Sequence, residues 1–324
     1  MREERTASKE SRPTAETPDT SSDESFIFVV DGALLEQQSI ILALSLHRAH
    51  GHLKNVKNYA YVSERSRKLS ELLEFVYDTC NIKVRNLPAA DGRWFKPYPH
   101  GNKILACSES RPESWTTFLD TDIIVCKDIS GLRFQHDAEF LAVPEGLPTW
   151  GEGDKWARAY AHIGQEVPKE RVTLVRGREL LYPPYFNAGF LSFSEAAIGI
   201  EGRKFGAEWL ELASDFDRRC PVSNKRPWLD QITLPLTLYK HGIRWKALPD
   251  FYNYSLAKRG KIRRRENSVK VMHYHSFKYL EGRSYLKDQL EWLLDIAPPG
   301  LHRTIEQNFL NHGENISPLP PING

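Results

Sequence analysis

The sequence predicts an α/β fold in which helices cover both faces of a central sheet. Short runs of β-branched and aromatic residues alternate with segments of helical periodicity from residue 26 onward. The first run, over residues 26–30, is apolar throughout, which is typical of a strand buried on both faces. The chain has 324 residues, of which 40% are hydrophobic, so it can bury the core of one large α/β domain or of two small ones.

The N-terminal half contains the clearest alternation of strands and helices. Residues 1–25 contain almost no large apolar side chain and are expected to be a disordered tail. The first strand is expected over residues 26–30, and a helix closed by Gly51 follows it. The next elements are predicted in this order: a strand over 58–62, a helix over 66–77, a strand over 81–87, and strands over 115–119, 123–125 and 139–143.

The C-terminal half resumes the pattern after a long segment rich in Gly, Pro and Trp. Residues 144–184 form this segment, which we expect to be functional or locally folded. The remaining elements are predicted in this order: a strand over 190–193, helices over 206–215 and 229–239, strands over 243–248 and 269–274, and a helix around 285–294. We expect one domain over residues 26–297 and a C-terminal extension over 298–324, partly loose because its end is rich in proline.

Charge and cysteine usage argue against several classes of protein. Lys and Arg number 44 against 42 Asp and Glu, so a net charge of +2 argues against nucleic-acid binding through a broad positive field. No apolar run approaches the roughly 20 residues that span a bilayer, and the first residues lack the apolar core of a secretory signal. The cysteines form no C-x-x-C pair, which indicates reduced thiols in a cytoplasmic protein.

One dense basic run extends from Lys258 to Arg265. Such a run could bind a diphosphate, an anionic acceptor or, as a peripheral contact, a membrane surface. A solvated loop is an equally good interpretation, because most charge runs are solvated.

Two carboxylates interrupt an apolar strand. Asp120 and Asp122 follow Phe118 and Leu119, and in an extended backbone residues i and i+2 point to the same side. Both could then bind one Mn²⁺ or Mg²⁺ ion, which proteins often hold with one or two carboxylates and substrate phosphates. Such an ion neutralises charge on a departing diphosphate. The alternative, a surface turn with solvated aspartates, is disfavoured by the apolar residues on both sides.

Two histidines follow the same i, i+2 spacing near the last predicted strand. Neutral imidazole is a ligand for Mn²⁺ or Zn²⁺, so His273 or His275 could add to a metal site. Either one could instead be a packed, hydrogen-bonded side chain near the end of the sheet. Lys278 could contact phosphate, or it could be a solvated surface group.

Together these motifs resemble those of GT-A-fold glycosyltransferases, most closely the retaining family that includes glycogenin and the bacterial lipopolysaccharide galactosyltransferases. The resemblance implies a Rossmann-like mixed central sheet over residues 26–297. It also implies transfer of a sugar from a nucleoside diphosphate sugar, UDP-sugar by default, with Mn²⁺ or Mg²⁺ as cofactor. The acceptor would be a hydroxyl of a glycan, of a lipid-linked compound or of a small molecule.

The resemblance assigns roles to individual positions. Asp120 and Asp122 match the metal-binding D-x-D motif, and His273, or His275, would complete the metal site. The residues expected at the reacting carbon and the sugar are Asp230, Gln231 and Asn187. The residues expected to bind the donor are Val30, Asp31, Thr121, Asn187, Ala188, Gly189 and Lys278. By themselves, residues 187–189 could be only a tight turn and Asp230 only a helix N-cap.

The segment over 144–184 is the expected acceptor site, because aromatic faces pack well on sugar rings. The candidate acceptor residues are Trp150, Asp154, Trp156 and Arg158. The same residues could instead form the core of a local subdomain. If the reaction inverts configuration, Glu152 or Asp154 would be the catalytic base.

Two other functions are compatible with the sequence. One is a non-catalytic nucleotide-sugar or glycan-binding protein on the same fold. The other is a sugar nucleotidyltransferase, which needs a Gly-rich loop after the first strand to hold a triphosphate. Residues 31–35 contain a single glycine, which disfavours this second alternative.

Overall fold

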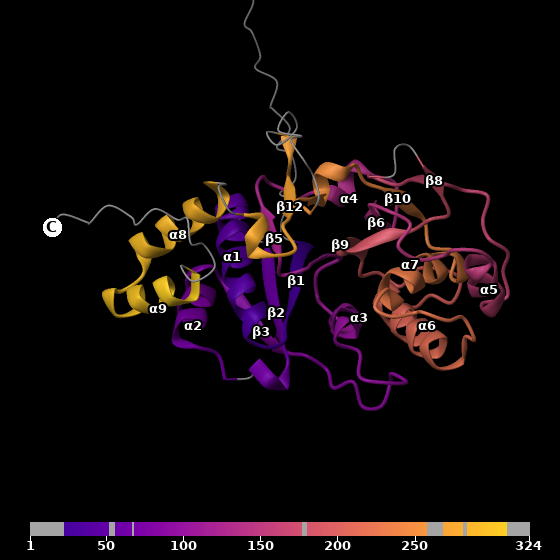
Figure 1. Cartoon of the computed structure of the whole chain (residues 1–324), viewed down its shortest axis with the longest axis horizontal. Helices are drawn as coiled ribbons and strands as arrows, with labels where there is room; N and C mark the ends of the chain where they lie inside the picture. The colour runs from indigo at the N-terminus through magenta and orange to yellow at the C-terminus, as the bar shows by residue number, and fades with distance from the viewer. Residues whose placement is uncertain are drawn as a thin grey trace, which may run out of the picture.

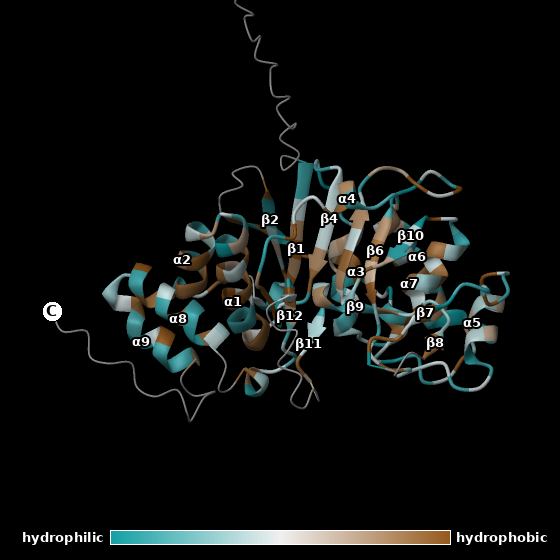
Figure 2. Cartoon of the chain, turned by 90° about the horizontal axis from the view of Figure 1, so that it is seen from above, coloured by the Kyte–Doolittle hydropathy of each residue, from teal (hydrophilic) through white to brown (hydrophobic). Residues whose placement is uncertain are grey.

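The computed structural model of the chain describes residues 23–51, 56–66, 68–176, 180–257, 268–280 and 284–309 (Figure 1). At its centre is a seven-stranded sheet in the order β10-β6-β9-β4-β1-β2-β3. The strands are β1 (Glu24–Val30), β2 (Lys57–Val62), β3 (Ile82–Asn86), β4 (Trp115–Leu119), β6 (Phe140–Pro144), β9 (Phe186–Ser194) and β10 (Trp245–Ala247). Helices lie on both sides of this sheet, so the predicted α/β class with a mixed central sheet is confirmed (Figure 2).

The sheet is mixed because β9 runs against both of its neighbours. β4, β1, β2 and β3 are parallel, whereas β9 is antiparallel to β4 and to β6. Leu119, the last residue of β4, lies opposite Phe190, so residues 186–189 of β9 extend past the end of β4. The carboxyl ends of β1 and β4 therefore meet the start of β9 at one edge, where α/β sheets bind their ligands.

The residues of β1 show how the sheet is buried on both faces. Phe26, Phe28 and Val30 belong to one core and Ile27 and Val29 to the other, as strand alternation requires. The helices of the first side are α1 (Ala33–His50), α2 (Glu71–Thr79), the short α4 (Leu132–Gln135), α8 (Ser284–Ile296) and α9 (Pro299–Phe309). Those of the second are α3 (Asn102–Ser108), α5 (Lys155–His162), α6 (Phe205–Arg219) and α7 (Leu229–Lys240). Within the described residues, no helix has both the length and the apolarity to cross a membrane.

After β4 the chain leaves the central sheet. β5 (Ile123–Val125) pairs with β12 (Val271–His273), which pairs with β11 (Tyr254–Ser255), in a separate three-stranded sheet. His273 lies opposite Ile123, and the N–H of Tyr274 donates to the carbonyl of Asp122 at 2.9 Å. The small sheet therefore holds a segment from late in the chain against the turn between β4 and β5.

Three parts of the chain differ from the expectations. β1 begins at Glu24, inside the expected tail, because its first two residues pair with β4. The helix α3 has no counterpart among the predicted elements. In the C-terminal extension, α9 places Ile305 and Phe309 in the first core, so this part is packed. Residues 1–22 and 310–324 and the basic run from Lys258 to Arg265 lie outside the described residues.

Candidate active site

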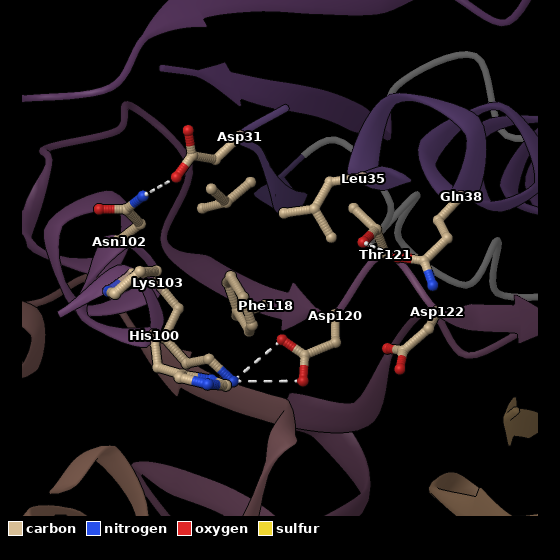
Figure 3. Close-up of a pocket in the computed structure, with 12 residues that line it drawn as sticks. Asp31, Leu35, Gln38, His100, Asn102, Lys103, Phe118, Asp120, Thr121 and Asp122 are labelled. Atoms are coloured by element: carbon tan, nitrogen blue, oxygen red, sulfur yellow. Dashed lines mark hydrogen bonds and ion pairs between the residues drawn. The ribbon is translucent and has the colours of Figure 1, made fainter. Parts of the chain in front are cut away.

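Two adjoining cavities lie at the carboxyl edge of β1 and β4. The first has a volume of about 250 Å³, and Asp31 and Thr121 are in its wall (Figure 3). The second, of about 330 Å³, lies against β9, α7 and β12. The residues that line both cavities are His100, Lys103, Asp120 and Asp122. The predicted site residues in the wall of the second alone are Asn187, Gly189, Asp230, Gln231, His273 and His275.

Asp120 and Asp122 enter the cavities from a turn and not from an extended strand. β4 ends at Leu119, and the N–H of Asp120 donates to the carbonyl of Gly189 in β9 at 2.9 Å. The i, i+2 alternation expected for the two aspartates is therefore absent, but the turn still brings both carboxylates to the shared wall. Thr121, between them, is buried and lines only the first cavity.

Asp122, His273 and His275 could together hold a divalent ion. One ligand atom from each lies within 4.8 Å of the other two, and His273 Nε2 is 3.1 Å from Asp122 Oδ1. The imidazole rings are 3.9 Å apart between centroids, so both histidines reach this carboxylate. A Cβ at Gly189 would lie 2.7 Å from His273 Cε1 and 3.0 Å from Asp120 Oδ2, so glycine keeps the space between these groups open. The donor set fits an ion such as Mn²⁺ that accepts both carboxylate and imidazole.

The proximity of these groups shifts their pKa values in different directions. Burial would raise the pKa of Asp122, but His273 beside it, together with His275 and Lys103, outweighs burial and lowers that pKa to about 2. Burial would lower the pKa of His273, and Asp122 reverses this, so the pKa is raised. Burial and the adjacent His273 lower the pKa of His275 to about 3. At neutral pH His275 is therefore an uncharged imidazole, which is the form that binds metals.

Lys103, in the first turn of α3, is a central residue that the sequence did not indicate. Its buried ammonium group is 2.9 Å from Asp120 Oδ1, 3.3 Å from Asp230 Oδ2 and 3.2 Å from the carbonyl of Ala188. Burial would lower the pKa of Lys103, but the two carboxylates raise it above its ordinary value, so the side chain is charged. Burial raises the pKa of Asp120 although Lys103 opposes this shift. Lys103 thus joins the two aspartates in one ionic network.

Asp230 and Gln231 lie side by side at the start of α7. The N-cap residue of this helix is Trp228, so Asp230 is in the first turn and is not the cap. Its Oδ1 is 3.0 Å from the hydroxyl of Tyr98, and its N–H donates to that hydroxyl at 3.1 Å. The Oε1 of Gln231 is buried and has no hydrogen-bond partner among the described residues. An orphan buried acceptor in a cavity wall is a place where a bound hydroxyl would donate.

Asn187 lies within β9 and not in a tight turn. Its Oδ1 accepts the N–H of Gly189 at 2.9 Å and the Nδ2–H of Asn253 at 2.7 Å. Its own Nδ2 donates to Glu145 Oε2 at 2.9 Å. Asn253 Oδ1 is in turn 3.0 Å from His273 Nδ1. A continuous chain of hydrogen bonds therefore runs from a buried carboxylate to a candidate metal ligand.

The expected donor-binding residues differ in their placement. Asp31 lines the first cavity and accepts a hydrogen bond from Asn102 Nδ2 at 2.9 Å. The side chain of Val30 points into the first core, and its neighbour Val29 lines the cavity instead. Lys278 is exposed and lines neither cavity, so the structure does not bring it to the site.

The residues expected to bind the acceptor form a local core or lie on the surface. Trp150 and Trp156 are only 2% and 5% exposed. Their rings are 5.0 Å apart, and that of Trp156 is 5.5 Å from Tyr185. The expectation that these faces stack on a sugar is corrected, because other aromatic rings already cover them. Asp154 and Arg158 are exposed and line neither cavity.

Comparisons with known proteins agree with this fold. The family model described as the Rhodobacterales glycosyltransferase domain matches residues 26–242, about two thirds of the chain. A crystal structure of the galactosyltransferase LgtC with donor and acceptor sugar analogues superposes with a TM-score of 0.53 at 15% identity, covering 87% of this chain and 99% of LgtC. The bifunctional glycosyltransferase WbbM superposes with a TM-score of 0.54 at 14% identity, covering 91% of this chain and 53% of WbbM. No curated protein matches the sequence. At these identities the superpositions show the GT-A fold.

Proposed function

The chain belongs to the Rhodobacterales glycosyltransferase domain family, and on that premise we propose that it moves a sugar from a nucleoside diphosphate sugar to an acceptor hydroxyl with retention of configuration. We propose a UDP-sugar as donor and Mn²⁺ or Mg²⁺ as cofactor. The observation that carries the proposal is one cavity wall in which Asp122, His273 and His275 lie beside Lys103 and Asp230.

The site residues form two groups, one at the leaving diphosphate and one at the sugar carbon, on either side of the bond that breaks. When bound, the ion would neutralise negative charge on the leaving diphosphate. Asp122 with His273, or His275, would hold it, and the ammonium group of Lys103 would add positive charge to the same cavity. Asp230 and Gln231 present carboxylate and amide oxygens to the same cavity, where positive charge develops on the sugar carbon.

The nucleoside is proposed to bind in the first cavity and the acceptor in the second. Asp31 supports the assignment of the nucleoside to the first cavity. It follows β1 and lines this cavity, and its carboxylate accepts a hydrogen bond from Asn102. The second cavity supports the assignment of the acceptor, since the orphan Oε1 of Gln231 can accept a hydrogen bond from a hydroxyl of the sugar or of the acceptor. The acceptor itself is proposed to be a glycan, a lipid-linked compound or a small molecule.

Retention is supported by the position of the alternative bases. Glu152 and Asp154, the carboxylates that could deprotonate an acceptor in an inverting reaction, are exposed and line neither cavity. Proton NMR of the first product formed should show the anomeric configuration of the donor sugar. The opposite configuration would contradict this part of the proposal.

Release of nucleotide tests the transfer reaction. The protein is incubated with a panel of UDP- and GDP-sugars and Mn²⁺, and we expect slow donor hydrolysis that Asp122→Asn abolishes. Asp154→Asn, an exposed carboxylate outside both cavities, is the matched control and should retain full turnover. Donor binding without turnover would favour the non-catalytic sugar-nucleotide-binding alternative, and equal turnover by both variants would contradict the metal site.

We also propose that the enzyme works in the cytoplasm. All four cysteines are free thiols, and Cys80, Cys107 and Cys220 are buried. Burial raises the pKa of the Cys80 thiol to about 12, so this side chain is an inert apolar group. Free thiols are usual in reducing compartments.

A further inference from the structure

We infer that the metal site uses two histidines: His275 binds the ion together with Asp122 and His273, and hydrogen bonds to Asn253 and Ser255 fix the orientation of the two rings. The inference concerns the same site as the proposed function and rests on it for the presence of an ion. It goes further by assigning both histidines as ligands and by predicting which ion the site prefers.

The orientation of His273 follows from a chain of unambiguous donors and acceptors. The backbone N–H of Gly189 can only donate, so the atom of Asn187 that it contacts at 2.9 Å is the carbonyl oxygen. That oxygen accepts Asn253 Nδ2–H at 2.7 Å, which leaves Asn253 Oδ1 facing His273 Nδ1 at 3.0 Å. Nδ1 of the neutral ring must then carry the proton, and the lone pair is on Nε2.

Nε2 of His273 faces the carboxylate. It is 3.1 Å from Asp122 Oδ1. Two neighbouring ligands of one octahedral ion, each bound at about 2.1 Å, are separated by about 3 Å. The spacing therefore already suits a shared ion. Asn253 is a positioning residue, since it fixes the tautomer and rotation of a ligand and does not reach the ion, as is usual around metal-bound histidines.

The side chain of His275 reaches Asp122 and His273 because its backbone adopts a positive φ. Its φ is +60°, a left-handed conformation that is uncommon for residues other than glycine and that concentrates at functional sites. This turn puts its ring 3.9 Å from that of His273, and Ser255 Oγ lies 2.7 Å from its Nε2. Ser255 of β11 is paired with His273 of β12, so the small sheet holds the hydrogen-bond partner of one ring next to the other ring.

The donor set determines the preferred ion. Mg²⁺ favours oxygen ligands, whereas imidazole suits later divalent metals, with affinity rising from Mn²⁺ through Co²⁺ to Ni²⁺. Asp120 is paired with Lys103, so the site offers the ion one carboxylate, that of Asp122, and two imidazoles. We therefore expect Mn²⁺ to bind more tightly than Mg²⁺, and Co²⁺ more tightly than Mn²⁺.

Metal binding without nucleotide or sugar tests the inference separately from sugar transfer. Mn²⁺ is titrated into the full chain and followed by electron paramagnetic resonance, and pulsed measurements count the nitrogen ligands of the bound ion. We expect two nitrogen couplings in the wild type and one in His275→Asn, because asparagine tolerates the same backbone. The expected loss of Mn²⁺ affinity is at least tenfold, and a smaller loss is expected for Mg²⁺. His136→Asn, outside both cavities, should change neither.

Further variants test the two positioning residues. Asn253→Ala should weaken Mn²⁺ binding by about tenfold or more, and Asn253→Asp, which keeps an acceptor for Nδ1 but loses the donor to Asn187, should recover part of the affinity. Ser255→Ala tests the second ring if His275→Asn does not fold, and it should also weaken binding. One nitrogen coupling in the wild type, or unchanged affinity in His275→Asn or Ser255→Ala, overturns the inference. Two couplings in a chain that transfers no sugar would contradict only the proposed function.

Discussion

At the scale of single residues, the site depends on one buried cation. Lys103 is the only Lys or Arg among the described residues that line the two cavities. Its buried ammonium group pairs with both Asp120 and Asp230. Removing one partner of a buried ionic network leaves charge uncompensated, which costs more than the network contributes.

We therefore expect Lys103→Met to lower the free energy of unfolding by about 3 kcal/mol and to reduce turnover. Urea unfolding of the metal-free protein measures the first effect, and nucleotide release measures the second. Lys287→Met removes an exposed lysine paired with Glu291 in α8 and should cost less than about 0.5 kcal/mol. Equal losses in the two variants would contradict the buried network.

A second residue-scale prediction concerns Gly189. An added Cβ would lie within 3.0 Å of Asp120 and His273, so one of them must move. We expect Gly189→Ala to weaken Mn²⁺ binding about tenfold or more while the far-ultraviolet circular dichroism stays native, since β9 tolerates alanine. Gly300→Ala is the control, because a Cβ there meets nothing within 4 Å. Wild-type affinity in Gly189→Ala, measured by calorimetry, would show that these side chains are not held in place.

The sequence predicted the carboxylates and histidines of the site but not their cationic partner. Asp120, Asp122, His273 and His275 were predicted because each pair has a short, fixed spacing next to an apolar run. Lys103 has no such local signal, since it reaches Asp120 only through the packing of α3 on the sheet. Composition also cannot distinguish aromatic side chains that bind a sugar from aromatic side chains that form a core. Trp150 belongs to a core, because it is buried.

At the scale of elements, Arg111 determines where α3 lies. Its side chain is fully buried and donates to the carbonyls of Ala106 and Cys107 at 2.8 and 3.1 Å, which satisfies the C-terminal end of α3. It also pairs with Glu195, which follows β9, at 2.5 Å, and donates to Thr116 of β4 at 2.9 Å. One guanidinium thus fastens the helix that carries the site lysine to two central strands.

We expect Arg111→Met to lower the free energy of unfolding by about 4 kcal/mol, because the buried Glu195 would lose its close ion pair and keep only Lys204 at 3.6 Å. Arg111→Lys keeps the charge but has too few donors in a fixed plane for all these acceptors, so it should recover only part of the loss. Urea denaturation of the three proteins measures both effects. A loss below 1 kcal/mol in Arg111→Met would contradict the role given to this side chain.

The strands flanking the D-x-D motif illustrate what local patterns predict at this scale. The apolar runs predicted β4 and β5 closely, because each buries its side chains along its whole length. That the two strands belong to different sheets was not predicted, since it depends on the pairing of β5 with β12, more than 140 residues later. The same non-local pairing is what brings His273 to Asp122.

At the scale of the whole molecule, one mixed sheet between two cores places the candidate ligand-binding residues at one edge of the sheet. The alternation of strands and helices predicted the sheet, and the resemblance of the motifs predicted the GT-A fold, which the family match and the superpositions support. The reversal of β9 has no local signature, yet it carries Asn187 and Gly189 past the end of β4 to Asp120. The site is therefore a product of topology as much as of motifs.

Global stability should respond to a histidine far from this edge. His241, which ends α7, is 2% exposed, and its Nε2 is 3.2 Å from Glu208 of α6. Burial lowers the pKa of His241 below its ordinary value of 6.5, and Lys240 adds to this shift. The unfolded chain therefore binds a proton more readily than the folded chain below pH 6.5. The neutral side chain contributes full stability above pH 6.5, and this contribution decreases as the pH falls toward the folded pKa.

His241→Gln removes the titrating group, so the comparison isolates its contribution from those of all other groups. Between pH 7.5 and 5.5 the wild type should lose stability relative to the variant, by at most about 1.4 kcal/mol per pH unit for one proton. Urea unfolding at several pH values measures the difference. Mn²⁺ affinity at neutral pH should be the same in both proteins, because His241 lines neither cavity. A stability difference that is independent of pH would mean that folding does not shift the pKa of His241, and a wild type that loses stability relative to the variant as the pH rises would mean that Glu208 holds His241 protonated; either result would contradict the prediction.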